Sequence, residues 1–211
     1  MPKTSKAWMR EHVNDPYVKR AKAEGYHSRA AYKLQQIARK DGLLKPGMTV
    51  VDLGAAPGGW SQVAAEAVGP TGRVVAVDLL EMAQVPGVTV IRGDFREQAT
   101  LEALERALGE RGVDLVMSDM APNLSGIAAV DQSRSMALAE LGLEFAASHL
   151  KPQGNFLVKT FQGAGFEELV ASLRRFFVQL QTRKPDASRS RSNEVYLLGK
   201  GLRPKGARGS R

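Results

Sequence analysis

The sequence predicts an α/β protein in which a mostly parallel sheet carries helices on both faces. Short apolar runs typical of buried strands alternate with longer segments of helical periodicity, and a glycine-rich turn follows the first run. A chain of 211 residues suits one domain with a sizeable core. The last two strand candidates have no helix between them, which favours an antiparallel hairpin at one edge of the sheet.

The expected elements follow from these local patterns. In chain order, the expected strands are Thr49–Leu53, Arg73–Val77, Val88–Ile91, Val113–Met117, Asn155–Lys159, Val178–Arg183 and Val195–Leu198. The expected helices between them are Trp60–Val68, Thr100–Gly109, Ser133–Leu150 and Gly165–Phe176. A further helix is expected before the first strand, with Ser28 as its N-cap and apolar positions through Ile37. This alternation places successive strands in parallel and predicts a single domain over residues 28–199.

Both ends of the chain fall outside this pattern. Residues 1–27 are polar and basic with little apolar periodicity, and we expect a mobile arm that a partner can order. Residues 200–211 contain glycine, proline and arginine, and we expect a disordered basic tail without core-forming side chains.

Net charge points to a polyanionic partner. The formal charge is +8 and the isoelectric point is about 9.9, although a basic but inert surface would give the same totals. Basic residues gather before Asp41 and after Arg174, whereas the middle of the chain is nearly balanced. The N-terminal group includes three aromatic residues that can stack on bases, namely Trp8, Tyr17 and Tyr26. Four cations near the other end are expected to contact phosphates: Arg183, Lys184, Arg189 and Arg191.

Composition also excludes several classes of site. The sequence has no cysteine, which rules out disulfides, thiolate metal sites and a cysteine nucleophile. The three histidines, His12, His27 and His149, have no metal-ligand spacing. No apolar run approaches the ~20 residues that span a bilayer. A cytoplasmic protein without a structural metal is the simplest interpretation.

The most informative stretch runs from residue 50 to residue 60, Val-Val-Asp-Leu-Gly-Ala-Ala-Pro-Gly-Gly-Trp. A strand leads into a turn of small residues and then a helix, so a ligand can approach the backbone closely near Gly54 and Gly58. The spacing does not match G-x-G-x-x-G, and Pro57 lies inside the turn, which argues against a nicotinamide dinucleotide. The G-K-[ST] ending of a triphosphate-binding loop is absent as well. A tight connection without a ligand is the simpler alternative.

Acidic residues at the next two strand ends weaken that alternative. Asp78 closes the second strand, where its carboxylate can accept both hydroxyls of a ribose. Asp94 follows the third strand, where it can accept from an adenine amino group. The order glycine turn, Asp78, Asp94 fits an adenosine lying across the sheet, with a methionine part over the turn.

Four motifs in the same order resemble the FtsJ/RrmJ family of ribose methyltransferases. They are Asp-Leu-Gly-Ala-Ala-Pro-Gly-Gly-Trp-Ser-Gln at 52–62, Ser-Asp-Met-Ala-Pro-Asn at 118–123, Val-Lys-Thr-Phe-Gln-Gly at 158–163, and Arg-Lys-Pro-Asp at 183–186 with Ser-Asn-Glu-Val-Tyr at 192–196. The similarity covers Ser28 to Leu198, nearly the whole expected domain. Thr160 and Asn193 depart from the family pattern, but neither is a catalytic position.

The resemblance implies a Rossmann-like methyltransferase fold of seven strands with the last one antiparallel. It implies S-adenosylmethionine as cofactor and the 2′-hydroxyl of a ribose, a uridine in the single-domain bacterial members, in large-subunit ribosomal RNA as substrate. The implied partner is ribosomal RNA within the large subunit, with no membrane or metal, and the protein is expected to act as a monomer. The implied catalytic residues are Lys33, Asp119, Lys159 and Glu194. The implied cofactor-binding residues are Gly54, Gly58, Trp60, Asp78, Asp94 and Asp119.

These residue types suit the reaction. Methyl transfer from a sulfonium requires the attacking oxygen to be held in line and its proton to be removed. We expect Lys159 to be the base, Asp119 to orient it, and Lys33 and Glu194 to position the ribose. A second ammonium and partial burial disfavour charge on Lys159, whereas the two carboxylates favour it.

Other functions remain open at this point. A non-catalytic RNA-binding protein of ribosome assembly would be expected to lose at least one of the four catalytic residues. A methyltransferase acting on transfer RNA or on an mRNA cap would keep all of them. A nicotinamide oxidoreductase is the weakest alternative because of the glycine spacing.

Overall fold

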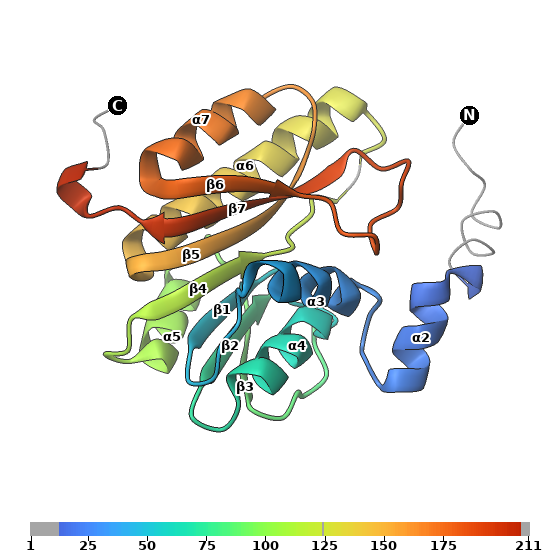
Figure 1. Ribbon diagram of the computed structural model, residues 1–211, viewed down its shortest axis with the longest axis horizontal. Coiled ribbons are helices and arrows are strands. Elements are labelled where there is room, and N and C mark those ends of the chain that lie inside the picture. Colours follow the sequence, from blue (N-terminus) through green and yellow to red (C-terminus); the bar gives the residue numbers. More distant parts are fainter. Residues whose placement is uncertain (1–12, 124, 208–211) are drawn as a thin grey trace.

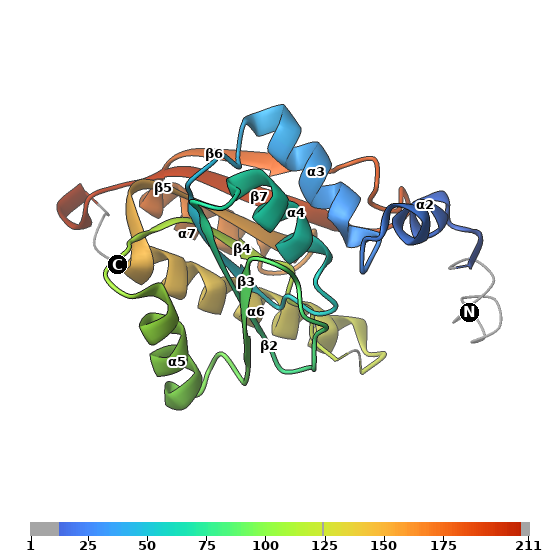
Figure 2. The same cartoon turned by 90° about the horizontal axis from the view of Figure 1, so that it is seen from below.

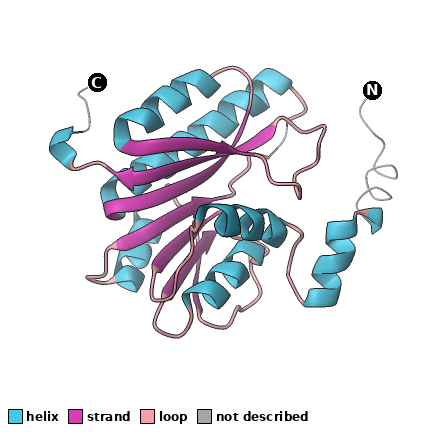
Figure 3. Ribbon diagram, viewed as in Figure 1, coloured by secondary structure: helices cyan, strands magenta, loops and turns pink. Residues whose placement is uncertain are grey.

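A central sheet organises the protein (Figures 1 and 3). Within residues 13–123 and 125–207, which the computed structural model describes, the strands are β1 (Thr49–Leu53), β2 (Arg73–Asp78), β3 (Val88–Arg92), β4 (Val113–Ser118), β5 (Leu150–Phe161), β6 (Phe177–Arg183) and β7 (Glu194–Leu202). These described strands form one seven-stranded sheet with the order β3-β2-β1-β4-β5-β7-β6. The strands from β3 to β5 run parallel, and β7 runs antiparallel to both of its neighbours. The predicted fold class and the antiparallel last strand are confirmed.

Helices cover both faces of this sheet (Figure 2). The helices are α2 (Pro16–Glu24), α3 (Ala30–Asp41), α4 (Gly59–Val68), α5 (Gln98–Leu108), α6 (Ala128–His149) and α7 (Phe166–Phe176), followed by a 3-10 turn, η1 (Lys205–Ala207). Side chains of α3 and α4 pack on one face with Val50, whereas those of α5, α6 and α7 pack on the other with Val51. Successive residues of β1 point to opposite faces of the sheet. Because helices cover both faces, β1 is buried along its whole length.

Helix α2 is the main element that the sequence pattern did not indicate, since residues 1–27 were expected to form a mobile arm. Asp15 caps this helix by accepting from the amide of Tyr17 at 2.9 Å, Pro16 occupies the first turn, and Gly25 ends it in the left-handed conformation with φ of 79°. Residues 1–12 of the expected arm lie outside the described residues.

Two local predictions were wrong. Ser28 does not cap α3: Arg29 occupies the N-cap position without a side-chain hydrogen bond, and the hydroxyl of Ser28 is buried without a partner among the described residues. The expected tail begins too early, because β7 continues to Leu202, which is fully buried in the core. Leu202 pairs with Phe177 of β6 and so belongs to the sheet. Residues 208–211 of the expected tail lie outside the described residues.

The remaining differences are at element ends. Helix α6 begins five residues before the expected position, and β5 begins at Leu150 rather than Asn155. Every helix in the described ranges is too short or too polar to span a lipid bilayer.

Candidate active site

The four predicted catalytic residues come from separate parts of the chain and meet at one edge of the sheet. Asp119 directly follows β4, and Lys159 lies near the end of β5, its parallel neighbour. Strand β7 runs in the opposite direction, so its first residues lie beside the end of β5: Glu194 pairs with Phe161, and Tyr196 pairs with Lys159. Lys33 reaches this edge from α3, which packs over the sheet.

Lys159 and Asp119 form the first of two ion pairs. The Lys159 ammonium lies 3.0 Å from Oδ1 of Asp119 and also donates a hydrogen bond to the backbone carbonyl of Asp119. Lys159 is 9% exposed, so this cation is almost fully removed from water. Such a buried charge is stabilised only where acceptors replace its hydration, and Asp119 supplies two of them.

Lys33 and Glu194 form the second pair. The ammonium of Lys33 lies 2.6 Å from Oε1 of Glu194, which also accepts from the hydroxyl of Ser188 at 2.9 Å. Burial acts to raise the pKa of the Glu194 carboxyl, but the Lys33 ammonium and the Ser188 hydroxyl outweigh it and hold that pKa below its usual range. Glu194 therefore carries a negative charge at neutral pH.

Tyr196 connects the two pairs, and the sequence analysis assigned it no role. Its hydroxyl accepts from Lys33 at 3.2 Å and lies 3.2 Å from Oδ1 of Asp119 and 3.3 Å from Oε1 of Glu194. Burial, with the nearby carboxylates, raises the pKa of this phenol well above its usual value, so it stays protonated. The signal in the sequence was the spacing: residues two apart on a strand share a face, which places Tyr196 beside Glu194.

The glycine-rich turn lies at the same edge, between β1 and α4. Gly54 adopts φ of 75°, and a Cβ atom there would lie 2.6 Å from Cγ of Met120, so the segment after β4 packs directly against the turn. Gly58 precedes α4 with φ of 111°. Both positions favour glycine because other residues rarely adopt such angles. Where a Cβ would project, Gly54 faces Met120 and Gly58 faces His27, so these glycines allow neighbouring segments to pack closely against the turn.

Asp78 is oriented by the backbone around it. Its Oδ2 accepts from the amide of Ala56 in the glycine-rich turn, and its Oδ1 accepts from the amide of Leu80, both at 2.8 Å. Each oxygen keeps lone-pair capacity for a further donor. The carboxylate at the end of β2 thus remains able to accept from a pair of hydroxyls.

Asp94 and Trp60 occupy different surroundings. The guanidinium and the backbone amide of Arg96 donate to Asp94 and lower the pKa of its carboxyl to about 2, so Asp94 is charged. Trp60 is 2% exposed, its indole N–H donates to the carbonyl of Ala30 at 2.9 Å, and its ring packs 5.6 Å from that of Tyr196. The Trp60 side chain therefore belongs to the core, and its role toward the cofactor stays a prediction.

A buried acid that the sequence analysis left unassigned lies beneath the turn. Asp52 of β1 is fully buried; its Oδ2 accepts from the hydroxyl of Ser61 at 2.6 Å, whereas its Oδ1 has no partner among the described residues. Burial raises the pKa of this carboxyl to about 7, and the negative charges of Asp119 and Asp78 act in the same direction.

The cations expected to contact phosphates have different local partners. Arg183 is paired with Asp41 through two hydrogen bonds of 2.7 and 2.8 Å, and Lys184 donates to the carbonyl of Ser192 at 2.6 Å. Arg189 lines an open pocket at the surface. Of the aromatic residues predicted to stack on bases, Tyr17 and Tyr26 pack against Tyr32. Trp8 lies outside the described residues.

No cluster of three or more histidine, aspartate or glutamate side chains in the described ranges is arranged to hold a metal ion.

Comparison with known proteins adds to this geometry. A ribosomal RNA large subunit methyltransferase E from Nitrosospira multiformis is 62% identical over 201 residues, which are 95% of this chain and 98% of that protein. The protein of the same name from Methylobacillus flagellatus is 60% identical, over 93% of this chain and 95% of its own.

Solved structures share the fold. A Plasmodium falciparum structure assigned as a ribosomal RNA methyltransferase has a TM-score of 0.73 at 28% identity and covers 84% of this chain and 98% of its own. The fibrillarin of Aeropyrum pernix, solved with natively bound S-adenosyl-L-methionine, has a TM-score of 0.54 at 19% identity, with 80% of this chain and 75% of its own covered. At that identity the likeness concerns the fold alone.

The model of the FtsJ-like methyltransferase family matches residues 26–202, a range that contains β1 to β7 and all four residues of the two ion pairs. The resemblance drawn from the sequence motifs is therefore confirmed, and the chain belongs to the FtsJ-like methyltransferase family.

Proposed function

We propose that this protein transfers the methyl group of S-adenosylmethionine to the 2′-hydroxyl of a ribose, in a uridine of large-subunit ribosomal RNA. The observation that carries the proposal is the pairing of Lys159 with Asp119 at 3.0 Å, beside the second pair Lys33–Glu194, on the edge of the sheet where the glycine-rich turn also lies. The names of the bacterial relatives support the substrate RNA, since those proteins are 60–62% identical over nearly their whole length.

The residues at this edge fit the cofactor. Gly54 and Gly58 give the turn its backbone conformation, Asp78 retains acceptor capacity for ribose hydroxyls, and Asp94 presents a charged carboxylate. When bound, S-adenosylmethionine supplies a methyl group on a positively charged sulfonium, a strong electrophile. The chain must therefore hold the attacking oxygen and remove its proton, rather than activate the donor.

Lys159 is placed to accept that proton. In its neutral form the amine takes the proton of the 2′-hydroxyl and becomes an ammonium. The carboxylate and the carbonyl oxygen of Asp119 stabilise this developing charge, because both already lie within contact distance of Nζ.

The second pair is placed to position the ribose. Lys33 and Glu194 neutralise one another at 2.6 Å, and Tyr196 fixes both relative to Asp119. This arrangement limits how the four side chains can move, which matters because a displacement of about 1 Å in reacting groups can lower rates by about 10².

The test is a map of ribose methylation in total RNA from cells with and without the gene. We expect one 2′-O-methyl mark in large-subunit ribosomal RNA to disappear and to return when the wild-type gene is restored. Lys159→Ala should not restore it, although the purified variant should still bind S-adenosylmethionine in calorimetry. Lys151→Ala is a matched control because Lys151 is also a β5 lysine paired with an aspartate, Asp114, at 2.9 Å, but near the opposite end of the strand.

Loss of a mark on a base instead of a ribose would overturn the proposed reaction. Full restoration by Lys159→Ala would overturn the assignment of the base. A missing mark in transfer RNA would overturn the proposed substrate.

A further inference from the structure

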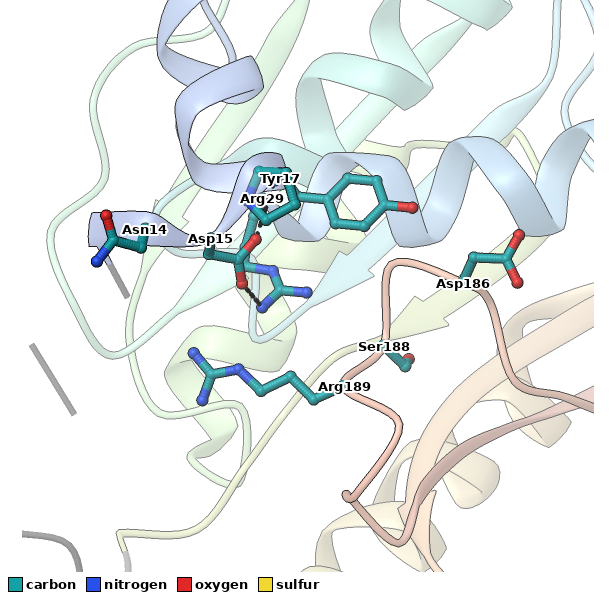
Figure 4. A pocket seen from close by; sticks show the side chains of 8 residues that line it. Asn14, Asp15, Tyr17, Arg29, Asp186, Ser188 and Arg189 are labelled. Atoms are coloured by element: carbon teal, nitrogen blue, oxygen red, sulfur yellow. Dashed lines mark hydrogen bonds and ion pairs between the residues drawn. The ribbon is translucent and has the colours of Figure 1, made fainter. Parts of the chain in front are cut away.

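A pocket of about 480 Å³ lies between the start of α2 and the loop that joins β6 to β7 (Figure 4). Its volume falls within the usual range for ligand sites. We name this cavity the α2 pocket. It is lined by Asn14, Asp15, Pro16, Tyr17, Arg29, Asp186, Ser188 and Arg189. No local sequence pattern indicates this pocket, because its two walls are some 170 residues apart in the chain.

Arg29 holds the two walls together. Its guanidinium donates to the carboxylate of Asp15 on one wall and to the carbonyl of Ala187 on the other. Ala187 is fully buried against Ala21 of α2 and Tyr32 of α3, and its amide donates to the side chain of Gln36 at 3.0 Å. The loop is therefore tied to α2 and α3, so the pocket is preformed.

Two charged groups at this pocket remain uncommitted. Across residues 13–123 and 125–207, the side chains of Asp186 and Arg189 take part in no hydrogen bond or ion pair, in contrast to those of Arg183 and Lys184. Asp15 and Arg29 neutralise one another. The pocket thus offers the guanidinium of Arg189 as a donor and the carboxylate of Asp186 as an acceptor, and Figure 4 shows the two groups on opposite sides of the pocket.

The α2 pocket adjoins the active site through Ser188. This residue lines the pocket, and its hydroxyl donates to Oε1 of Glu194 at 2.9 Å. Glu194 is in turn joined to Asp119 and Lys159 through Tyr196, by contacts no longer than 3.3 Å. The pocket therefore lies next to the side chains to which the proposed function assigns the ribose.

We propose that the α2 pocket binds the nucleotide next to the methylated one, in single-stranded RNA, a proposal that rests on the proposed function. Arg189 contacts its phosphate, and Asp186 accepts from an exocyclic amino group of its base. Sequence-specific recognition of RNA uses unstacked bases whose edges are hydrogen-bonded by side chains, and this donor and acceptor set matches one such nucleotide. A purely phosphate-binding site would not need the carboxylate of Asp186.

Steady-state kinetics of Arg189→Ala test the phosphate contact. The substrate is the large ribosomal subunit isolated from cells that lack the gene, and the donor is radiolabelled S-adenosylmethionine. We expect KM for the subunit to rise about tenfold, as for loss of one charge-assisted hydrogen bond, and the salt dependence to become shallower by about one unit of slope. KM for S-adenosylmethionine and kcat should stay within twofold of wild type.

Arg175→Ala is the matched control, because it removes the same charge from an exposed position on α7. Its kinetic constants should equal those of wild type. Identical rises in KM for both variants would show a general effect of net charge and would overturn the α2 pocket as a site. If Arg189→Ala equals wild type while wild type methylates the ribose, only the pocket proposal fails. If wild type methylates no ribose, the proposed function itself fails.

Crosslinking tests the position directly and does not depend on kinetics. Because the chain has no cysteine, Asn14→Cys provides a single attachment point for a thiol-reactive photo-crosslinker at the α2 pocket. Reverse transcription of the crosslinked RNA should stop one or two nucleotides from the methylated ribose, and Arg175→Cys should give no stop in that region. A stop from Asn14→Cys at a distant helix, or none beside the methylated ribose, would overturn the proposal.

Discussion

The hydroxyl of Tyr196 lies 3.2 Å from Oδ1 of Asp119, the same oxygen that lies 3.0 Å from the Lys159 ammonium. A phenol has one proton to donate and can accept as well. Tyr196 accepts from Lys33, so its proton is directed to a carboxylate, either Asp119 or Glu194. The two ion pairs thus form one hydrogen-bonded network in which a shift of the phenol proton changes the field at Lys159.

Tyr196→Phe should therefore lower kcat. The ring of residue 196 still packs against Trp60. Lys33, Asp119 and Glu194 lose the hydroxyl that they share, and leaving such buried groups without this partner costs about 1–3 kcal/mol of interaction free energy. We expect kcat to fall about tenfold, with KM for S-adenosylmethionine changed less than twofold. Tyr32→Phe is the control, because the Tyr32 hydroxyl donates to Glu24 at 2.9 Å and lies outside the network of the two ion pairs. This variant should leave kcat unchanged. Equal kcat values for Tyr196→Phe and wild type would contradict this role.

Asp52→Asn should change how stability depends on pH. In the unfolded chain an aspartate loses its proton near pH 4, whereas burial raises the pKa of Asp52 in the folded protein to about 7. Between these values the folded state binds more protons than the unfolded state, so stability falls as pH rises from about 4 to about 7 and then levels off. The variant lacks this contribution.

Urea denaturation of both proteins from pH 4 to pH 8 measures the effect. The unfolding free energy of Asp52→Asn relative to wild type should increase across this window by roughly 3–4 kcal/mol, and should be constant above pH 7. A difference that does not vary with pH would mean that Asp52 ionises in the folded protein as it does in the unfolded chain.

Gly54→Ala should lower the free energy of unfolding more than Gly42→Ala, although both substitutions place an alanine at a positive φ. Gly42 also has positive φ, 60°, but a Cβ atom there has no neighbour within 4 Å, so Gly42→Ala should cost only the strain of about 1–2 kcal/mol. At Gly54 the added Cβ meets Cγ of Met120 at 2.6 Å and its backbone at 2.9 Å, which adds about 1–3 kcal/mol of overpacking. Thermal unfolding compares the two. Gly54→Ala alone should also weaken S-adenosylmethionine binding in calorimetry, and equal effects of the two variants would refute the close approach of Met120.

Affinity for RNA should depend steeply on salt. The chain carries a net charge of +8, and an interface with 6–10 phosphate contacts loses about 10³–10⁵ in affinity between 50 and 200 mM salt. Filter binding of large-subunit RNA across this range gives the slope. An affinity that stays constant would show that the basic ends do not contact the phosphates.

The elements with strong periodicity were predictable, and those stabilised by distant contacts were not. Strand β1 was predicted to the residue because apolar side chains fill both of its faces. Helix α2 has only Val18 and Ala21 as buried residues, so its apolar pattern is weak. It is held instead by tertiary contacts such as Arg29 with Asp15. Asp15, Pro16 and Gly25 are nevertheless capping signals that could have located its ends.

The candidate site was predictable as a set of residues but not as a geometry. The motifs named Lys33 and Glu194, but nothing in the sequence shows that they pair at 2.6 Å across 161 positions. For Trp60 the motif was the less reliable guide. Its motif position suggests contact with a ligand, yet its side chain is buried against Tyr196. Ser188 was overlooked because a single serine in a polar loop carries no pattern, although it contacts Glu194.

The reversed direction of β7 has a consequence for the order of events during synthesis. Lys33 is made before the strands of the described sheet, whereas Glu194 and Tyr196 are added only after six of those strands. A ribosome-bound nascent chain that stops before Glu194 can contain the whole glycine-rich turn and still have no complete set of catalytic partners. The proposed active site is therefore assembled only after β7 has been made, and a fragment that stops before Glu194 should lack the proposed activity.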